Sequence, residues 1–67
     1  MAILKVVEIL AESNKSWEEA AKTAIAEASK TVKNIKSAYI QEQSLVINDN
    51  NITAYRVNVK ISFAVER

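Results

Sequence analysis

The sequence contains no cysteine, histidine, glycine or proline. Without cysteine and histidine, the chain can form neither disulfides nor the Cys/His zinc sites that stabilise many very small domains. The nucleophile and base pairs built on these two residues are missing as well, and no motif places two carboxylates together at the end of a strand. We therefore predict that the protein is not an enzyme.

The chain is also short, and its charge is nearly balanced. We expect one domain, residues 1–67, and a chain of about 60 residues buries only roughly 60% of its unfolded surface. Oligomerisation is the remaining common source of stability. The net charge of +1 gives no electrostatic footprint for nucleic acid or anionic lipid. No stretch approaches the roughly 20 apolar residues of a membrane span, so we expect a cytoplasmic protein with no nucleic-acid or membrane partner.

A first strand and the start of a helix are indicated near the amino end. Residues 3–10 are rich in β-branched side chains and are followed by a polar cluster, which predicts a strand. Ser16 and Glu19 have the spacing of a capping box, so a helix should begin at Trp17.

Apolar residues then recur at three- and four-residue spacing, which predicts an amphipathic helix over 17–34 with an alanine-rich apolar stripe. We expect three lysines to complement the negative end of the helix, namely Lys30, Lys33 and Lys36. Asn34 is expected to take the left-handed conformation at the helix exit, because the chain has no glycine.

A long hairpin is predicted after the helix. The stretches 37–47 and 52–65 flank four turn-forming residues, 48–51. Pairing Ile47 with Ile52 sets a register in which apolar residues face apolar ones and polar residues face polar ones. In this register Glu42 falls on the apolar face, as an exception to the pattern.

The predicted helix is too small for the predicted sheet. A helix over 17–34 is about 27 Å long, whereas strand residues 55–65 span about 36 Å. A helix about 10 Å wide shields about two strands of a sheet. Neighbouring subunits are the simplest cover for the remaining apolar surface.

The chain resembles the dodecin family over nearly its whole length. The resemblance rests on the β-α-β-β order, the length, Lys5-Val6-Val7-Glu8-Ile9, the stretch from Ser13 to Ala21, and the ending from Tyr55 to Phe63. It implies an α+β subunit in which a three-stranded antiparallel sheet wraps one helix, and a hollow homododecamer. It also implies binding or sequestration of a small ligand, since many dodecins store pairs of flavins.

Dodecins stack flavin on a tryptophan at the start of the second strand and contact it with a glutamine on the third. The matching positions here are Ser37 and Arg56. A serine has no aromatic surface to replace the stacking of an indole, so we expect weak or lost binding of flavin such as FMN or riboflavin. Tyr39, about 7 Å further along the strand, offers only a displaced ring.

The stretch from Ser16 to Ala21, with Glu42-Gln43 and the stretch from Ile52 to Arg56, resembles more closely the branch described as calcium dodecin, which also lacks the stacking tryptophan. Calcium is therefore a candidate ligand, but no metal-binding residues are assigned. A flavin-storing dodecin and a purely structural shell remain the alternatives.

Several residues allow two interpretations. Trp17 is expected to pack against the sheet or a neighbour, with ligand stacking as the alternative. Arg56 is expected to be solvated or to form an ion pair at an interface, with an anion or ligand contact as the alternative. Glu42 is either an exposed group or a carboxylate paired across a subunit contact. The turn 48–51 is an alternative source of ion ligands.

Overall fold

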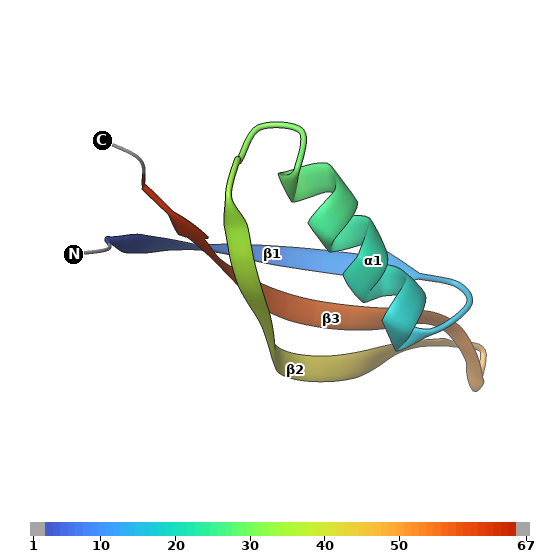
Figure 1. Cartoon of the computed structure of the whole chain (residues 1–67). Coiled ribbons are helices and arrows are strands. Elements are labelled where there is room, and N and C mark those ends of the chain that lie inside the picture. Colours follow the sequence, from blue (N-terminus) through green and yellow to red (C-terminus); the bar gives the residue numbers. More distant parts are fainter. Residues whose placement is uncertain (1–2, 66–67) are drawn as a thin grey trace.

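The computed structural model describes residues 3–65 and has the element order β1 (Leu4–Ser13), α1 (Trp17–Ala28), β2 (Ile35–Asn48) and β3 (Asn51–Ala64). The three strands form one antiparallel sheet in the order β1-β3-β2, so β3 is the central strand. Helix α1 lies across one face of this twisted sheet (Figure 1). The predicted β-α-β-β architecture with a three-stranded antiparallel sheet is confirmed.

The start of α1 follows the predicted capping chemistry. Ser16 has an extended backbone conformation, and its Oγ accepts a hydrogen bond from the Glu19 amide at 3.0 Å. Its carbonyl accepts from the amide of Ala20 at 3.1 Å. Glu18 and Glu19 place two carboxylates in the first turn, where the helix dipole favours negative charge.

The end of α1 differs from the prediction, because the helix stops at Ala28. The Ser29 hydroxyl donates to the carbonyl of Ile25 at 2.7 Å, and the amides of Lys30 and Thr31 donate to carbonyls three residues back, which tightens the last turn. The last helical turn holds no basic residue, so the expected lysine pairing with the dipole is wrong. Asn34 is left-handed as predicted, with φ of 63°, but it ends the connection to β2.

The β2–β3 hairpin closes through a two-residue loop. Asp49 and Asn50 have φ of 51° and 63°, as a type I′ turn requires, and Asn48 pairs with Asn51. The predicted pairing of Ile47 with Ile52 is confirmed, although the loop is shorter than the four residues expected.

The hairpin register shifts between its two ends. Ile40 pairs with Val59 but Glu42 pairs with Asn58, so Gln41 is an extra residue that bulges from β2. Because side chains alternate along a strand, this bulge moves Glu42 to the face of Asn58, away from the helix. The expectation that Glu42 lies on the apolar face is therefore wrong.

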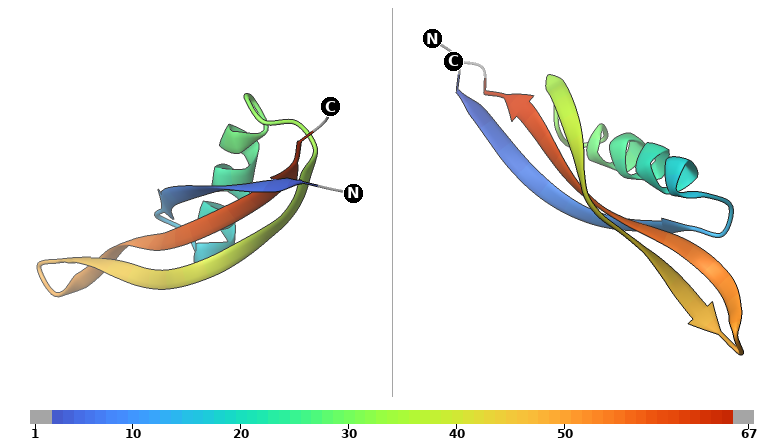
Figure 2. Two further views of the ribbon diagram at one scale, coloured as in Figure 1. Left: turned by 90° about the vertical axis from the view of Figure 1, so that its left-hand side faces the viewer. Right: turned by 90° about the horizontal axis from the view of Figure 1, so that it is seen from below.

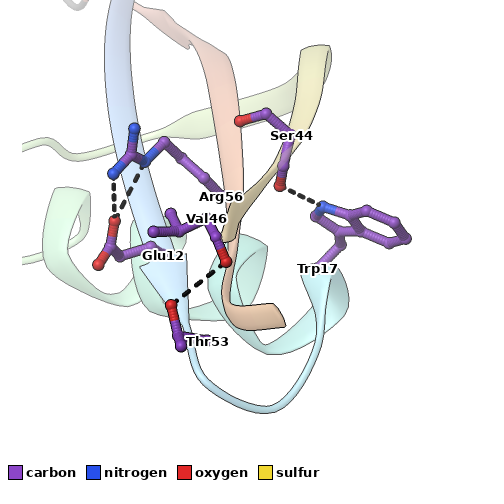
Figure 3. A network of polar contacts seen from close by, with 6 residues as sticks. All are labelled: Glu12, Trp17, Ser44, Val46, Thr53 and Arg56. Atoms are coloured by element: carbon purple, nitrogen blue, oxygen red, sulfur yellow. Dashed lines mark hydrogen bonds and ion pairs between the residues drawn. The ribbon is translucent and has the colours of Figure 1, made fainter. Parts of the chain in front are cut away.

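A second irregularity restores the original register near the turn. Val46 pairs with Ala54, whereas Ile47 pairs with Ile52, which leaves Thr53 as an extra residue on β3. The Thr53 hydroxyl donates to the carbonyl of Val46 at 3.2 Å and holds this bend (Figure 3).

The core is a small contact between α1 and β3. The buried side chains come from one stripe of the helix and alternate positions of the central strand: Ala20, Ala24, Ala28, Val57, Val59 and Ile61. The two views in Figure 2 show the sheet continuing beyond the helix. Among residues 3–65, nine large hydrophobic residues are exposed: Ile3, Leu4, Val6, Leu10, Tyr39, Ile40, Leu45, Ile47 and Ile52. Within the same range, no helix is long and apolar enough to cross a membrane.

Replacing Ser16 by alanine should lower the free energy of unfolding by about 1 kcal/mol, because the amide of Glu19 loses its acceptor. Urea unfolding at one fixed protein concentration measures the difference. Ser44→Ala is the matched control, because Ser44 is exposed and the structure gives its backbone carbonyl, not its hydroxyl, a hydrogen bond, and we expect it to change stability by less than about 0.5 kcal/mol. Equal stability of Ser16→Ala and the unmodified protein would contradict the capping role.

Candidate ligand-binding face of the sheet

The side of the sheet away from the helix is here called the outer face; polar side chains predominate on it along β2 and β3, whereas exposed Leu4, Val6 and Leu10 lie on it along β1. Val57, Val59 and Ile61 are buried under α1, so the alternate residues of β3 point the other way. The outer face carries Arg56, Asn58, Lys60 and Ser62 from β3, with Glu8 and Glu12 from β1 and Ser37, Tyr39, Glu42 and Ser44 from β2.

The three predicted site residues lie on this face but do not converge within one chain. Ser37 pairs with Ser62 and Tyr39 with Lys60, near one end of the sheet. Arg56 is six residues from Ser62 along β3, which corresponds to about 20 Å. A compact ligand that contacts both Ser37 and Arg56 must therefore lie between two copies of the chain.

Ser37 and Tyr39 occupy exposed positions at the start of β2. The Ser37 hydroxyl is hydrogen-bonded to that of Ser62 on the neighbouring strand. Tyr39 is 64% exposed, which leaves much of its side chain open to a ligand or a second subunit. These positions therefore supply hydroxyl groups and one accessible ring.

Arg56 is held by a carboxylate that sequence reasoning missed. Its Nε and Nη2 both donate to Oε1 of Glu12, at 3.1 and 3.0 Å (Figure 3). The pair joins β1 to β3, and the two side chains are 54% and 40% exposed for Glu12 and Arg56. The sequence predicted a solvated side chain or an ion pair at an interface, whereas this ion pair lies within one chain. The signal was the direct opposition of these residues in the β1–β3 register.

Asn58 was also missed. It lies on the outer face between Leu10 and Glu42, and its Oδ1 is buried without a hydrogen-bond donor among the residues that the structure describes. A buried amide oxygen of this kind ordinarily receives a hydrogen bond from water or from another molecule.

Trp17 connects the start of the helix to the hairpin. Its Nε1 donates to the carbonyl of Ser44 at 3.1 Å (Figure 3). Its ring meets that of Tyr55 edge to face, with centroids 5.3 Å apart. These contacts confirm that Trp17 packs against the sheet, and they give it a structural role in holding β2 near the bulge.

The outer face does not form a metal site within one chain. Residues 3–65 contain no group of three or more Asp or Glu side chains close enough to hold an ion.

Together, the fold and this face define a small α+β domain whose helix covers one side of a three-stranded sheet and leaves the other side open. The sequence profile of the Dodecin family matches residues 3–66. The chain belongs to the dodecin family, as the resemblance in its sequence predicted.

Two relatives show how the chain lies within this family. It is 33% identical over 63 residues to the calcium dodecin of Mycobacterium tuberculosis, with 94% of this chain and 89% of that protein covered. The crystal structure of that calcium-chelating antigen, described with a novel calcium-binding site, matches with a TM-score of 0.84 and 31% identity over 96% of this chain and 91% of the other.

A point variant of the dodecin of Thermus thermophilus matches the backbone more closely, with a TM-score of 0.94 over 100% of both chains, at 25% identity. Of these two proteins, the calcium dodecin is thus more similar to this chain in sequence, as predicted, whereas the Thermus protein is more similar to it in backbone structure. We give the sequence more weight for ligand chemistry, because side chains rather than the backbone path distinguish ligands.

The Glu12–Arg56 pair should contribute little to stability, since both side chains are partly exposed. A double-mutant cycle with Glu12→Gln and Arg56→Gln should give a coupling of about 0.2–1 kcal/mol. This coupling should fall in about 1 M salt, where screening is strong. A coupling of several kcal/mol that resists salt would contradict this and indicate that assembly buries the pair.

Proposed function

We propose that this single-domain chain is the subunit of a hollow homododecamer that binds or sequesters a small ligand without catalysis, and that its capacity for flavin is reduced. Membership of the dodecin family is the observation that carries the proposal. A cytoplasmic location is part of the same proposal.

Self-assembly is supported by the apolar surface that one chain leaves open. Helix α1 has 12 residues and β3 has 14, which correspond to lengths of about 18 Å and 46 Å. Exposed Leu4, Val6 and Leu10 line β1, and exposed Leu45, Ile47 and Ile52 cluster near the hairpin turn. Apolar surface distributed in this way is typical of subunit contacts.

Reduced flavin binding is supported by the side chains at the matching positions. The Ser37 hydroxyl is hydrogen-bonded to the Ser62 hydroxyl, and serine has no ring on which an isoalloxazine can stack. Arg56 replaces a neutral amide and already donates two hydrogen bonds to Glu12. A flavin that contacts Arg56 must either displace the Glu12 carboxylate or bind next to its negative charge.

Calcium is the second candidate ligand, and the similarity to calcium dodecin favours it. Glu8, Glu12 and Glu42 supply carboxylates to the outer face. Calcium takes six to eight oxygen ligands, so we place such a site between copies of the chain. Flavin storage and a purely structural shell are the other outcomes of the tests below.

Native mass spectrometry of the protein as purified should give twelve subunits, because sister chains cover the open apolar surface. The same spectrum reports bound flavin or calcium as added mass, and a chelator removes only the metal. A folded protomer alone at micromolar concentration would overturn the assembly. Twelve subunits with no added mass, before or after incubation with calcium or riboflavin, would favour the structural shell.

Replacing Ser37 by tryptophan should strengthen riboflavin binding by about 5- to 150-fold, because aromatic stacking on a flat ring is worth about 1–3 kcal/mol. Quenching of riboflavin fluorescence measures the affinity. Lys36→Trp is the control, since it places the same indole one residue away at the register shift next to Ser37. Equal affinity of Ser37→Trp and the unmodified protein would contradict the assignment of this position.

A further inference from the structure

A pocket of about 460 Å³ lies at the end of the helix-covered face, separate from the outer face. It exists because α1 stops at Ala28 while β1 and β3 continue past it. Lys5 pairs with Phe63, and each lies two residues along its strand from the pair formed by Val7 and buried Ile61. Because side chains alternate along a strand, Lys5 and Phe63 belong to the face that α1 covers. Where the helix ends, this part of the sheet becomes the floor of the pocket.

The connection between α1 and β2 forms the wall. The amide of Val32 donates to the carbonyl of Ala28 at 2.9 Å, which fixes the loop to the helix. The carbonyl of left-handed Asn34 accepts from the amide of Ala64 at 3.0 Å, which fixes its other end to β3. Backbone hydrogen bonds thus hold both ends of this wall in place, so the shape of the pocket is set by the backbone.

The lining combines an apolar floor with positive charge. Phe63 and Val32 are half-buried and contribute apolar surface. Lys5 and Lys33 are exposed lysines in the lining, one from the strand and one from the loop, and each brings one positive charge. The lining residues that the structure describes include no carboxylate, and Thr31 adds a hydroxyl group.

We propose that this pocket binds a phosphate monoester that carries a flat apolar group. Lysine ammonium groups bind phosphate as point charges, and two of them on one pocket match the charge of a phosphate monoester near pH 7. The apolar group would lie against Phe63 and Val32, and the pocket volume is within the usual range of about 300–1,000 Å³ for small-molecule sites. This site is independent of Ser37, Tyr39 and Arg56.

The test uses 1-naphthyl phosphate as the probe and the assembled protein, with isothermal titration calorimetry as the measurement. We expect 1-naphthol and inorganic phosphate each to bind at least about tenfold more weakly than the probe, because each lacks one half of the contact. Binding of the probe should weaken as salt is raised. No detectable binding of the probe, or equal binding of 1-naphthol, would overturn the proposal.

The double variant Lys5→Gln/Lys33→Gln should weaken probe binding by at least about tenfold. Both side chains are exposed, so the fold and the subunit number should be unchanged, as circular dichroism and native mass spectrometry can verify. The double variant Lys5→Arg/Lys33→Arg keeps the charge and should retain most of the affinity. Unaltered affinity in the glutamine variant would overturn the proposal.

Lys15→Gln/Lys22→Gln is the matched control for charge, because it removes two exposed lysines that do not line the pocket and do not lie in the connection between α1 and β2. It should leave probe binding unchanged. Excess riboflavin should also leave it unchanged, and competition between the two would place the probe on the outer face and overturn the pocket assignment. Since the two sites are separate, failure of either leaves the other intact.

Discussion

The structure depends on the contact between the alanine stripe of α1 and the central strand. Ala20, Ala24 and Ala28 lie one turn apart and are at most 5% exposed, and their small side chains let the helix backbone lie close to β3. This close contact buries little area per residue, because a methyl group has little apolar surface to remove from water. The fold is therefore specific in its geometry but has a small core. Both ends of the sheet, and most of β2, are left open as a consequence.

The features that sequence could predict are those set by neighbouring residues. Capping by Ser16 and a turn within 48–51 follow from local hydrogen bonding and backbone preference, although the loop itself has only two residues, Asp49 and Asn50. The end of the helix was not predicted, because apolar residues keep their helical spacing past Ala28. In the structure, the helix is ended by the hydrogen bond of the Ser29 hydroxyl and by the hydrogen bond that attaches Asn34 to β3. A periodic pattern alone does not contain that second, long-range contact.

The candidate site, too, has features that the sequence could predict and others that depend on long-range pairing. Family resemblance identified Ser37, Tyr39 and Arg56, and all three lie on the outer face. The bulge at Gln41 is set by pairing with β3 and has no local signature, yet it decides that Glu42 joins this face. Similarly, the partner of Arg56 is 44 residues away and becomes visible only when β1 is known to pair with β3. Long-range register, rather than residue type, determines which charges meet.

The comparisons explain why ligand chemistry can vary on such a fold. The backbone matches a Thermus dodecin at a TM-score of 0.94 although only 25% of the residues are identical. About three quarters of the residues therefore differ while the path of the chain stays closely similar. Positions outside the core, such as exposed Ser37 and partly exposed Arg56, make no comparable demand on the packing, so side chains on the outer face can differ while the chain keeps its fold.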